Sequence, residues 1–299
     1  MLDRSCIMVS MNKLPRAKRI QILSALVEGN SIRATCRMTD TAKGTVLKLL
    51  VDAGAACADY QDRTLRNLPC KRIQCDEIWS FVRCKAKNLP EKRKDEWGVG
   101  DVWTWTAIDA DSKLVPSFMV GTRDGAAARA FITDLAGRLA SRVQLTTDGH
   151  KSYLEAVEGA FGCDIDYAML IKQYGEAASD SPERKYSPGE CCGTKREVIQ
   201  GCPAREHIST SYVERQNLTM RMSMRRFTRL TNAFSKKVEN LEAAVALHFM
   251  NYNFCRIHQT LRVTPAMEAG VSDHVWNLGE VVDLIDAAAA VQAPTAAAK

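Results

Sequence analysis

Residues 73–82 read Ile-Gln-Cys-Asp-Glu-Ile-Trp-Ser-Phe-Val, a run rich in β-branched and aromatic residues. Such a run is typical of a packed strand, so we expect a strand here. Asp76 and Glu77 stand in its middle, on opposite faces, because successive side chains of a strand alternate. A carboxylate among apolar neighbours is costly unless it is paired or binds a cation. The alternative is an edge strand whose two acids lie near solvent.

The segments that follow alternate between strand and helix patterns. We expect strands over 102–109 and 114–121, which would form an antiparallel meander with the first strand. A helix is predicted from 125 to about 141, a fourth strand over 143–147 and a short fifth strand over 166–171. Together these elements predict an α/β fold built on a mixed sheet.

Asp148 directly follows the predicted fourth strand, in Asp148-Gly-His150. The carboxyl ends of strands are where sites are built in open α/β sheets, so Asp148 is a second candidate for a functional acid. The alternative is that Asp148 only caps a helix that begins near Lys151.

A third acid, Glu214, lies on a helix predicted to begin near residue 211. At 100° per residue, Glu214, Arg221 and Arg225 fall within about 40° of one another on that helix. Pairs seven and eleven residues apart are too far for ion pairing within a helix. A carboxylate site beside a phosphate-binding stripe, continued by Arg229, explains this face better.

Residues 172–206 are polar and rich in glycine and proline, without a visible period, and this pattern predicts a long loop or insertion. A zinc site could use the cysteines here with a later histidine: Cys191, Cys192, Cys202 and His207. Adjacent cysteines seldom chelate one metal, so zinc is the less favoured interpretation. Most of the 11 cysteines are expected to be small buried residues or free thiols in a reducing compartment.

The charge of this 299-residue chain is unevenly distributed around a net value of +6. Residues 1–72 hold 13 Lys and Arg against 6 Asp and Glu, and residues 215–237 hold 7 basic residues and no acid, whereas residues 238–299 hold 3 against 7. Two separated basic blocks indicate a polyanion contacted at two places. No apolar run reaches membrane-spanning length, so a cytoplasmic protein is expected.

The amino-terminal block is predicted to be helical over 13–28, 32–38 and 42–52, with the third helix ending at Gly54. A short helix, a tight turn and a further helix form the layout of a helix-turn-helix. The side chains expected to face DNA from the third helix are Lys43, Thr45 and Lys48. The alternative is a small helical bundle that binds no ligand.

The order of elements is that of the ribonuclease-H-like fold, in which the first strand lies beside the fourth. Asp76 and Asp148 would then meet, and the later helix would lay Glu214 across them. Three carboxylates at one point stay ionised only if cations bind, and hard oxygen ligands suit Mg²⁺ or Mn²⁺. Two such ions can activate a nucleophile and stabilise the leaving oxygen of a phosphoryl displacement. Periodicity alone allows either Asp76 or Glu77 in this role.

Three blocks of the sequence also resemble a known family. They are Cys75-Asp-Glu-Ile-Trp-Ser-Phe-Val82, Thr147-Asp-Gly149 and Tyr212-Val-Glu-Arg-Gln-Asn-Leu-Thr-Met-Arg221. They look like the signature blocks of bacterial insertion-sequence transposases with a DDE triad, most like the "insertion sequence one" family. The resemblance covers roughly residues 70–260, without the amino-terminal Cys-x-x-Cys motif that the family often carries.

The resemblance implies Asp76, Asp148 and Glu214 as the catalytic triad and metal ligands, and DNA strand cleavage and joining as the reaction. It implies double-stranded DNA as partner, both terminal inverted repeats and target, with a homo-oligomer assembled on DNA and no membrane. Backbone phosphates would be held by the arginines after the third block: Arg221, Arg225, Arg226 and Arg229.

The corresponding domains are 1–69 (helix-turn-helix), 70–265 (catalytic) and 266–299 (a helix and frayed tail). Two alternatives stay open. One is a nuclease or resolvase of the same fold that cuts without joining, and the other is a non-catalytic DNA-binding regulator that uses the amino-terminal helices.

Overall fold

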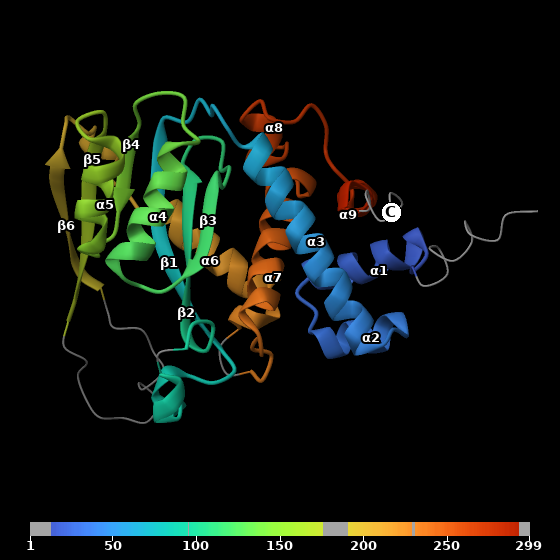
Figure 1. Cartoon of the computed structure of the whole chain (residues 1–299). Helices are drawn as coiled ribbons and strands as arrows, with labels where there is room; N and C mark the ends of the chain where they lie inside the picture. Colours follow the sequence, from blue (N-terminus) through green and yellow to red (C-terminus); the bar gives the residue numbers. More distant parts are fainter. Residues whose placement is uncertain (1–12, 95, 176–190, 229–230, 293–299) are drawn as a thin grey trace, which may run out of the picture.

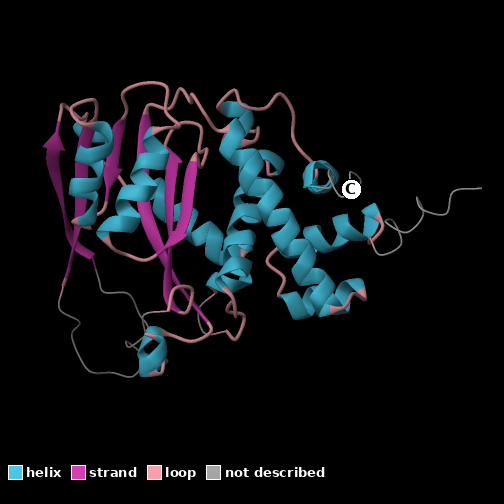
Figure 2. Ribbon diagram, in the orientation of Figure 1, coloured by secondary structure: helices cyan, strands magenta, loops and turns pink. Residues whose placement is uncertain are grey.

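The computed structural model describes residues 13–94, 96–175, 191–228 and 231–292 (Figures 1 and 2). Its centre is strand β1 (Arg72–Val82), inside a six-stranded sheet of order β3-β2-β1-β4-β5-β6. β1 pairs antiparallel with β2 (Gly100–Asp109) and parallel with β4 (Gln144–Thr147). The edge-strand alternative for residues 73–82 is therefore wrong, because β1 lies between β2 and β4, with β4 paired to residues 72–75, and Glu77 is buried.

The remaining strands extend the sheet on both sides. β3 (Ser117–Gly121) pairs antiparallel with β2, which confirms the predicted meander. β5 (Asp166–Tyr174) pairs parallel with β4, and β6 (Cys191–Gln200) pairs antiparallel with β5. The sheet is thus mixed, and its first strand lies beside its fourth, as the order of elements predicted.

Helices cover both faces of the sheet (Figure 1). Ile73 and Cys75 belong to the core shared with α4 (Gly125–Ala136) and α5 (Ser152–Phe161). Ile78 and Val82 belong to a second core. The helices of that core are α6 (Ser211–Ser223) and α7 (Val238–Met250). The two faces of β1 therefore look into different helical layers, which separates the surroundings of Asp76 from those of Glu77.

The prediction of a loop over 172–206 is wrong at both ends. β5 continues to Tyr174 and β6 occupies residues 191–200, while residues 176–190 lie outside the described residues. Seven of the ten residues of β6 are exposed and none is buried, because it is the edge strand of the sheet. An exposed edge strand buries no regular apolar face, so its sequence carries no period of two.

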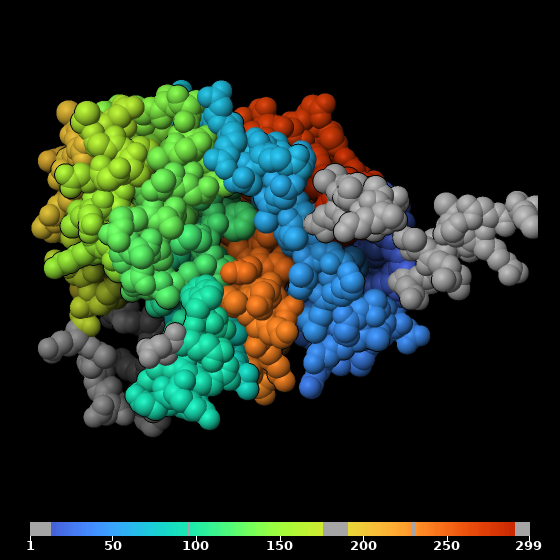
Figure 3. All heavy atoms as spheres, viewed as in Figure 1, coloured from blue at the N-terminus to red at the C-terminus, as the bar shows by residue number. Residues whose placement is uncertain are grey.

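The amino-terminal helices and the carboxy-terminal helix form one lobe beside the sheet (Figure 3). It contains α1 (Arg16–Val27), α2 (Ile32–Thr39), α3 (Lys43–Thr64) and α9 (Leu278–Gln292). Asp283 and Asp286 of α9 accept hydrogen bonds from Arg16 and Arg19 of α1 at 2.7–3.0 Å. Two acids of the last segment therefore pair with α1.

Helix α3 is longer than predicted, because Gly54 does not end it. A Cβ at Gly54 would lie 2.3 Å from the Cα of Ala243 in α7, so the glycine allows two helix backbones to touch. α3 runs on to Thr64 along α7 and joins the helical lobe to the layer beneath the sheet.

A short α8 (Pro265–Glu268) follows α7 after a π-helical turn, Asn251–Cys255. None of the helices in the described ranges has the length and apolar character needed to cross a membrane.

Candidate active site

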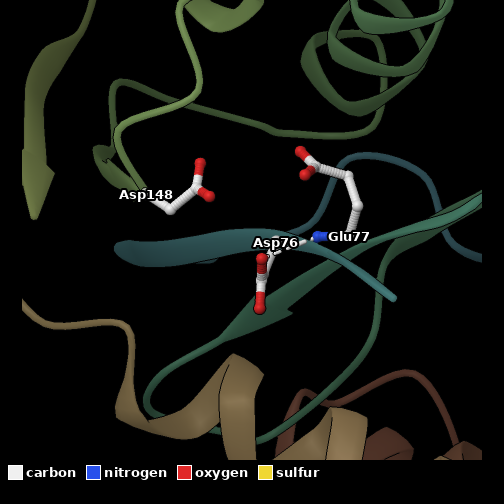
Figure 4. Close-up of side chains that lie close together, drawn as sticks. All are labelled: Asp76, Glu77 and Asp148. Atoms are coloured by element: carbon white, nitrogen blue, oxygen red, sulfur yellow. Dashed lines mark hydrogen bonds between the residues drawn. The ribbon is translucent and has the colours of Figure 1, made fainter. Parts of the chain in front are cut away.

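Strand register brings Asp76 and Asp148 together. In the parallel pair of β1 and β4, Cys75 lies opposite Thr147, and each acid is the next residue along its strand. One carboxylate oxygen from each of Asp76, Glu77 and Asp148 lies within 4.8 Å of the others (Figure 4). Within the described ranges, this is the one group of three or more His, Cys, Asp or Glu side chains close enough to hold a single ion. The residues named for a possible zinc site do not form such a group in those ranges: Cys191, Cys192, Cys202 and His207.

Asp76 and Glu77 leave β1 on opposite sides (Figure 4). Asp76 turns toward α6, where its Oδ2 accepts a hydrogen bond from Asn217 Nδ2 at 2.8 Å. Its Oδ1 accepts one from the backbone N–H of Glu77 at 2.8 Å. Glu77 turns toward α5 and Arg123, and its side chain is fully buried. The structure therefore places Asp76, and not Glu77, on the α6 side of the sheet.

Asp148 is not a helix cap, so that alternative is wrong. Its Oδ1 accepts a hydrogen bond from the backbone N–H of His150 at 2.9 Å, which stabilises the turn after β4. α5 begins only at Ser152, and the residue before it, Lys151, makes no side-chain cap. The other carboxylate oxygen of Asp148 faces Arg123 and the neighbouring acids.

Glu214 reaches this site from the first turn of α6. Gln74, two residues before Asp76 on the same face of β1, accepts hydrogen bonds from the backbone N–H groups of Tyr212 and Val213 at 2.9 and 3.2 Å. The start of α6 is thereby tied to β1. The negative charge of Glu214 contributes to the raised pKa of Asp76, so the two carboxylates act on each other, although Glu214 lies outside the closest group of three.

Two basic side chains of the protein neutralise these acids. Lys172 of β5 donates a hydrogen bond to Glu214 Oε2 at 2.5 Å, and Thr210 donates one to Oε1 at 2.5 Å. Arg123 lies 3.1 Å from Glu77 Oε2 and 3.7 Å from Asp148 Oδ2. About a third of the Lys172 and Arg123 side chains is exposed, so both can move aside without repacking the core. The sequence did not single out either residue, since each reaches the site from a separate element.

The surroundings of Asp76 and Glu77 disfavour the ionised forms of both side chains. Burial, then the charge of Asp148, raises the pKa of Asp76 to about 7 from an ordinary 3.8. Burial also raises the pKa of Glu77 to about 7. The buried Tyr153 hydroxyl lies close enough to lower the pKa of Glu77, yet among the described residues Glu77 Oε1 has no hydrogen-bond partner of normal geometry. Clustered oxygens, one of them buried and unpartnered, fit a hard divalent cation.

The proposed basic stripe does not continue along α6. The helix ends at Ser223, Met224 is extended, and Arg225 and Arg226 lie in the 3-10 turn Arg225–Phe227. Arg229 lies outside the described residues. The prediction that Arg225 continues the helical face of Glu214 and Arg221 is therefore wrong, because the chain turns at Met224. Arg221 stays in α6 and donates a hydrogen bond to the carbonyl oxygen of Phe227 at 3.2 Å.

In α3, the three side chains predicted to contact DNA are all exposed at or near the start of the helix. Lys48 forms an ion pair with Asp52 at 2.6 Å, one turn further along.

No protein-family model and no curated protein sequence matches this chain. Similar solved structures include a piggyBac transposase synaptic complex with hairpin DNA, with 10% identity and a TM-score of 0.40 over 94% of this chain and 73% of that one. The Mos1 transposase paired-end complex with the left transposon end has 13% identity and a TM-score of 0.22, covering 52% and 59% of the two chains. A pre-cleavage Mos1 transpososome has 12% identity and a TM-score of 0.20, covering 52% and 60%. At such TM-scores these likenesses assign neither fold family nor activity.

The pKa shifts predict a pH-dependent response to Mg²⁺. With a folded pKa of about 7, Asp76 and Glu77 hold protons that the unfolded chain releases above their ordinary pKa values of 3.8 and 4.5. Their contribution to stability is therefore present below about pH 4 and is lost as the pH rises through about 7. A divalent cation at this site would bind the ionised acids, so we expect Mg²⁺ to raise the melting temperature strongly at pH 8 and little at pH 5. At 100 times its Kd it would add about 2.7 kcal/mol of stability.

Differential scanning calorimetry at both pH values, with and without Mg²⁺, measures this response. Asp76→Asn is the control, since it removes a ligand and one of the raised pKa values together. An equal Mg²⁺ shift at pH 5 and pH 8, or an undiminished shift in Asp76→Asn, contradicts a metal site at these acids.

Proposed function

We propose that this chain is a DDE-type transposase of the insertion-sequence kind, with a ribonuclease-H-like catalytic domain. The observation that carries the proposal is the meeting of Asp76 and Asp148 through the β1–β4 register, with Glu214 held over the same face of β1 by α6. These are the acids of the three sequence blocks that resemble the family. The strand order, with the first strand beside the fourth, supports the fold assignment.

The proposed reaction has two displacements at phosphorus. Water attacks a phosphodiester at the element end, the P–O3′ bond breaks, and the leaving 3′ oxygen takes up a proton. The free 3′-hydroxyl then attacks a phosphodiester of target DNA and loses its proton, the P–O3′ bond of the target breaks, and the leaving 3′ oxygen of the target takes up a proton. Divalent ions, when bound, would stabilise the charge on the attacking and leaving oxygens.

The residues of the chain have separate tasks in this proposal. Asp76, Asp148 and Glu214 would hold Mg²⁺ or Mn²⁺, two ions in the form we favour. Asn217 orients Asp76 through its hydrogen bond, and Gln74 fixes the start of α6. Lys172 and Arg123 release their acids when metal binds and then place positive charge beside the phosphates.

The proposal requires double-stranded DNA, and the inverted repeats would flank the coding sequence. The test incubates the protein and Mg²⁺ with labelled duplexes taken from that flanking DNA, together with a target plasmid. A transposase yields cut ends and joined products. A nuclease or resolvase yields cut ends alone, and a regulator binds without cutting, so either of these results overturns the proposal.

The helix-turn-helix assignment is tested by substitution, because deleting residues 13–54 would cut through α3 where it contacts α7. We expect the double variant Thr45→Ala with Lys48→Ala to lose preference for repeat DNA over scrambled DNA. Each good base contact contributes about 1–3 kcal/mol, so the preference should fall at least about tenfold. Competition binding measures it, with Lys92→Ala, an exposed lysine on a different turn, as control. Unchanged preference in the double variant contradicts the assignment.

A further inference from the structure

A cavity separate from the candidate active site lies between the helical lobe and the segment that follows α6. This interlobe cleft has a volume of about 670 Å³, which is large enough for a nucleotide. Its walls come from the α1–α2 turn, the start of α3, residues 223–226 and 231–236, and the first part of α7. The carboxylates of the candidate active site are not among the described residues that line it.

The helical lobe and the end of α6 are in close contact near this cleft. Gly29, in the α1–α2 turn, has a φ of +80°, and a Cβ there would lie 3.0 Å from the carbonyl oxygen of Met222 at the end of α6. At the other wall, Ser235 pairs with Val82 at the end of β1. The cleft is therefore lined by the last residue of α6, Ser223, and by Ser235, which pairs with the end of β1.

The described residues that line the cleft carry an excess of positive charge. Five basic residues line it: Arg33, Lys43, Arg225, Arg226 and Lys236. No acid is among the described residues of the lining. None of the five has an ion-pair partner in the described ranges. Burial lowers the pKa of Arg226 to about 10, and its guanidinium donates to the Ser235 hydroxyl. A desolvated cation without a counter-charge is costly, and a bound anion removes that cost.

Part of the cleft wall is apolar. Leu26, Leu47, Leu50 and Leu247 line it together with His248. His248 is 4% exposed, and its Nε2 has no hydrogen-bond partner among the described residues. Burial lowers the pKa of this imidazole to about 3, so the ring is neutral at pH 7 and adds no charge to the cleft. An inorganic anion would use the cations but would leave this apolar wall and His248 unused.

We propose that the interlobe cleft binds one nucleotide of a DNA strand, with its phosphate on the basic rim and its base unstacked against the leucines beside His248. A base still stacked in a duplex cannot enter such a cleft, so the nucleotide is extrahelical or lies in a single strand. Glu214 and Ser223, which lines the cleft, are about 14 Å apart along the axis of α6. This separation equals about four nucleotides along a DNA duplex. The inference rests on the proposed function, since it takes the bound polymer to be the DNA substrate.

The test measures binding of the full-length protein to a labelled ten-nucleotide oligothymidine without Mg²⁺, so that no cleavage is needed. Arg33→Gln with Lys236→Gln removes two exposed or half-buried rim charges. We expect weaker binding by about tenfold or more and a salt slope lower by about 0.7 for each lost contact on a single strand. Lys92→Gln is the matched control and should change neither value beyond its effect on net charge.

The base is tested separately from the phosphate by Ala244→Phe, which fills the cleft from the half-buried face of α7. We expect it to weaken binding of oligothymidine but not of an abasic oligonucleotide of equal length. His248→Leu should act in the same direction, and the melting temperature of each variant shows whether it is folded. If rim variants weaken both probes equally while Ala244→Phe and His248→Leu affect neither, the cleft holds only backbone phosphates and the inference is wrong.

The inference and the proposed function fail in different ways. Cleft variants that bind oligothymidine as tightly as the unsubstituted protein, in a chain that cuts and joins DNA, overturn the inference alone. Oligothymidine binding that depends on the cleft, in a chain that neither cuts nor joins DNA, overturns the proposed function alone.

Discussion

We expect Asp76→Asn to lower DNA cleavage by at least about a thousandfold and to leave DNA binding intact, if the proposed function holds. A catalytic metal supplies several kcal/mol of charge stabilisation, and each 1.36 kcal/mol corresponds to a factor of ten in rate. The substitution keeps the shape of the side chain and an oxygen that can accept the hydrogen bond from Asn217. It also removes a carboxylate whose burial raises its pKa to about 7, so the metal-free variant should be no less stable than the unsubstituted protein at pH 8.

Glu77→Gln is the matched comparison, since Glu77 is the adjacent residue in the sequence and lies in the same close group of oxygens. Because Glu77 faces Arg123 and the α5 layer, we expect it to position Arg123 and Asp148, and its substitution to slow cleavage by no more than about tenfold. Glu214→Gln should resemble Asp76→Asn. Single-turnover cleavage and Mg²⁺ titration of all three variants decide the assignment. A loss in Glu77→Gln as large as in Asp76→Asn, with Glu214→Gln active, would replace Glu214 by Glu77 as the third ligand.

Gly54→Val is expected to destabilise the whole protein more than any other single change considered above. A Cβ at Gly54 would meet the Cα, Cβ and carbonyl oxygen of Ala243 at 2.3, 2.4 and 2.7 Å. Two of these atoms are backbone, so α3 and α7 must separate, and packing is lost along the contact that joins the lobes. Overpacking of this kind costs about 1–3 kcal/mol or more, and the branched side chain adds to it. The measurement is the free energy of unfolding from denaturant titration.

Gly44→Ala is the control in the same helix. No atom lies within 4 Å of a Cβ at Gly44, which is exposed in the first turn of α3. Alanine there should stabilise the helix slightly, by about 0.5 kcal/mol. Equal effects of the two substitutions would mean that the α3–α7 contact does not limit stability.

The apolar periods of the sequence determined most of the sheet in advance. The alternation in residues 102–109 and the apolar runs at 73–82 and 143–147 identified three of the strands that surround the candidate site, and their order predicted that the first and fourth would be neighbours. A strand that buries one or both faces must carry an apolar pattern, so its sequence shows it. β6 buries no regular face, which is why the sequence indicated a loop there.

The candidate site could be predicted in part. Acids inside a strand or at its end are unusual enough to mark Asp76 and Asp148 from sequence alone. Periodicity left the choice between Asp76 and Glu77 open, because a period of two says that they face opposite ways but not which helix covers each face, and only the family resemblance favoured Asp76. Only the packing of α6 against β1, through Gln74 and Asn217, put Asp76 on the side of Glu214.

Three further features depend on contacts between residues distant in the sequence. Lys172 and Arg123 reach the acids from other elements, and local sequence carries no information about such contacts. In the sequence, Gly54 resembles the end of a helix. In the structure it lies where α3 crosses α7, and the approach of Ala243 leaves no room for a Cβ. The turn at Met224 ended the helical stripe of arginines and placed Arg225 and Arg226 in the wall of the interlobe cleft, because tertiary packing overrides a continuous helical pattern.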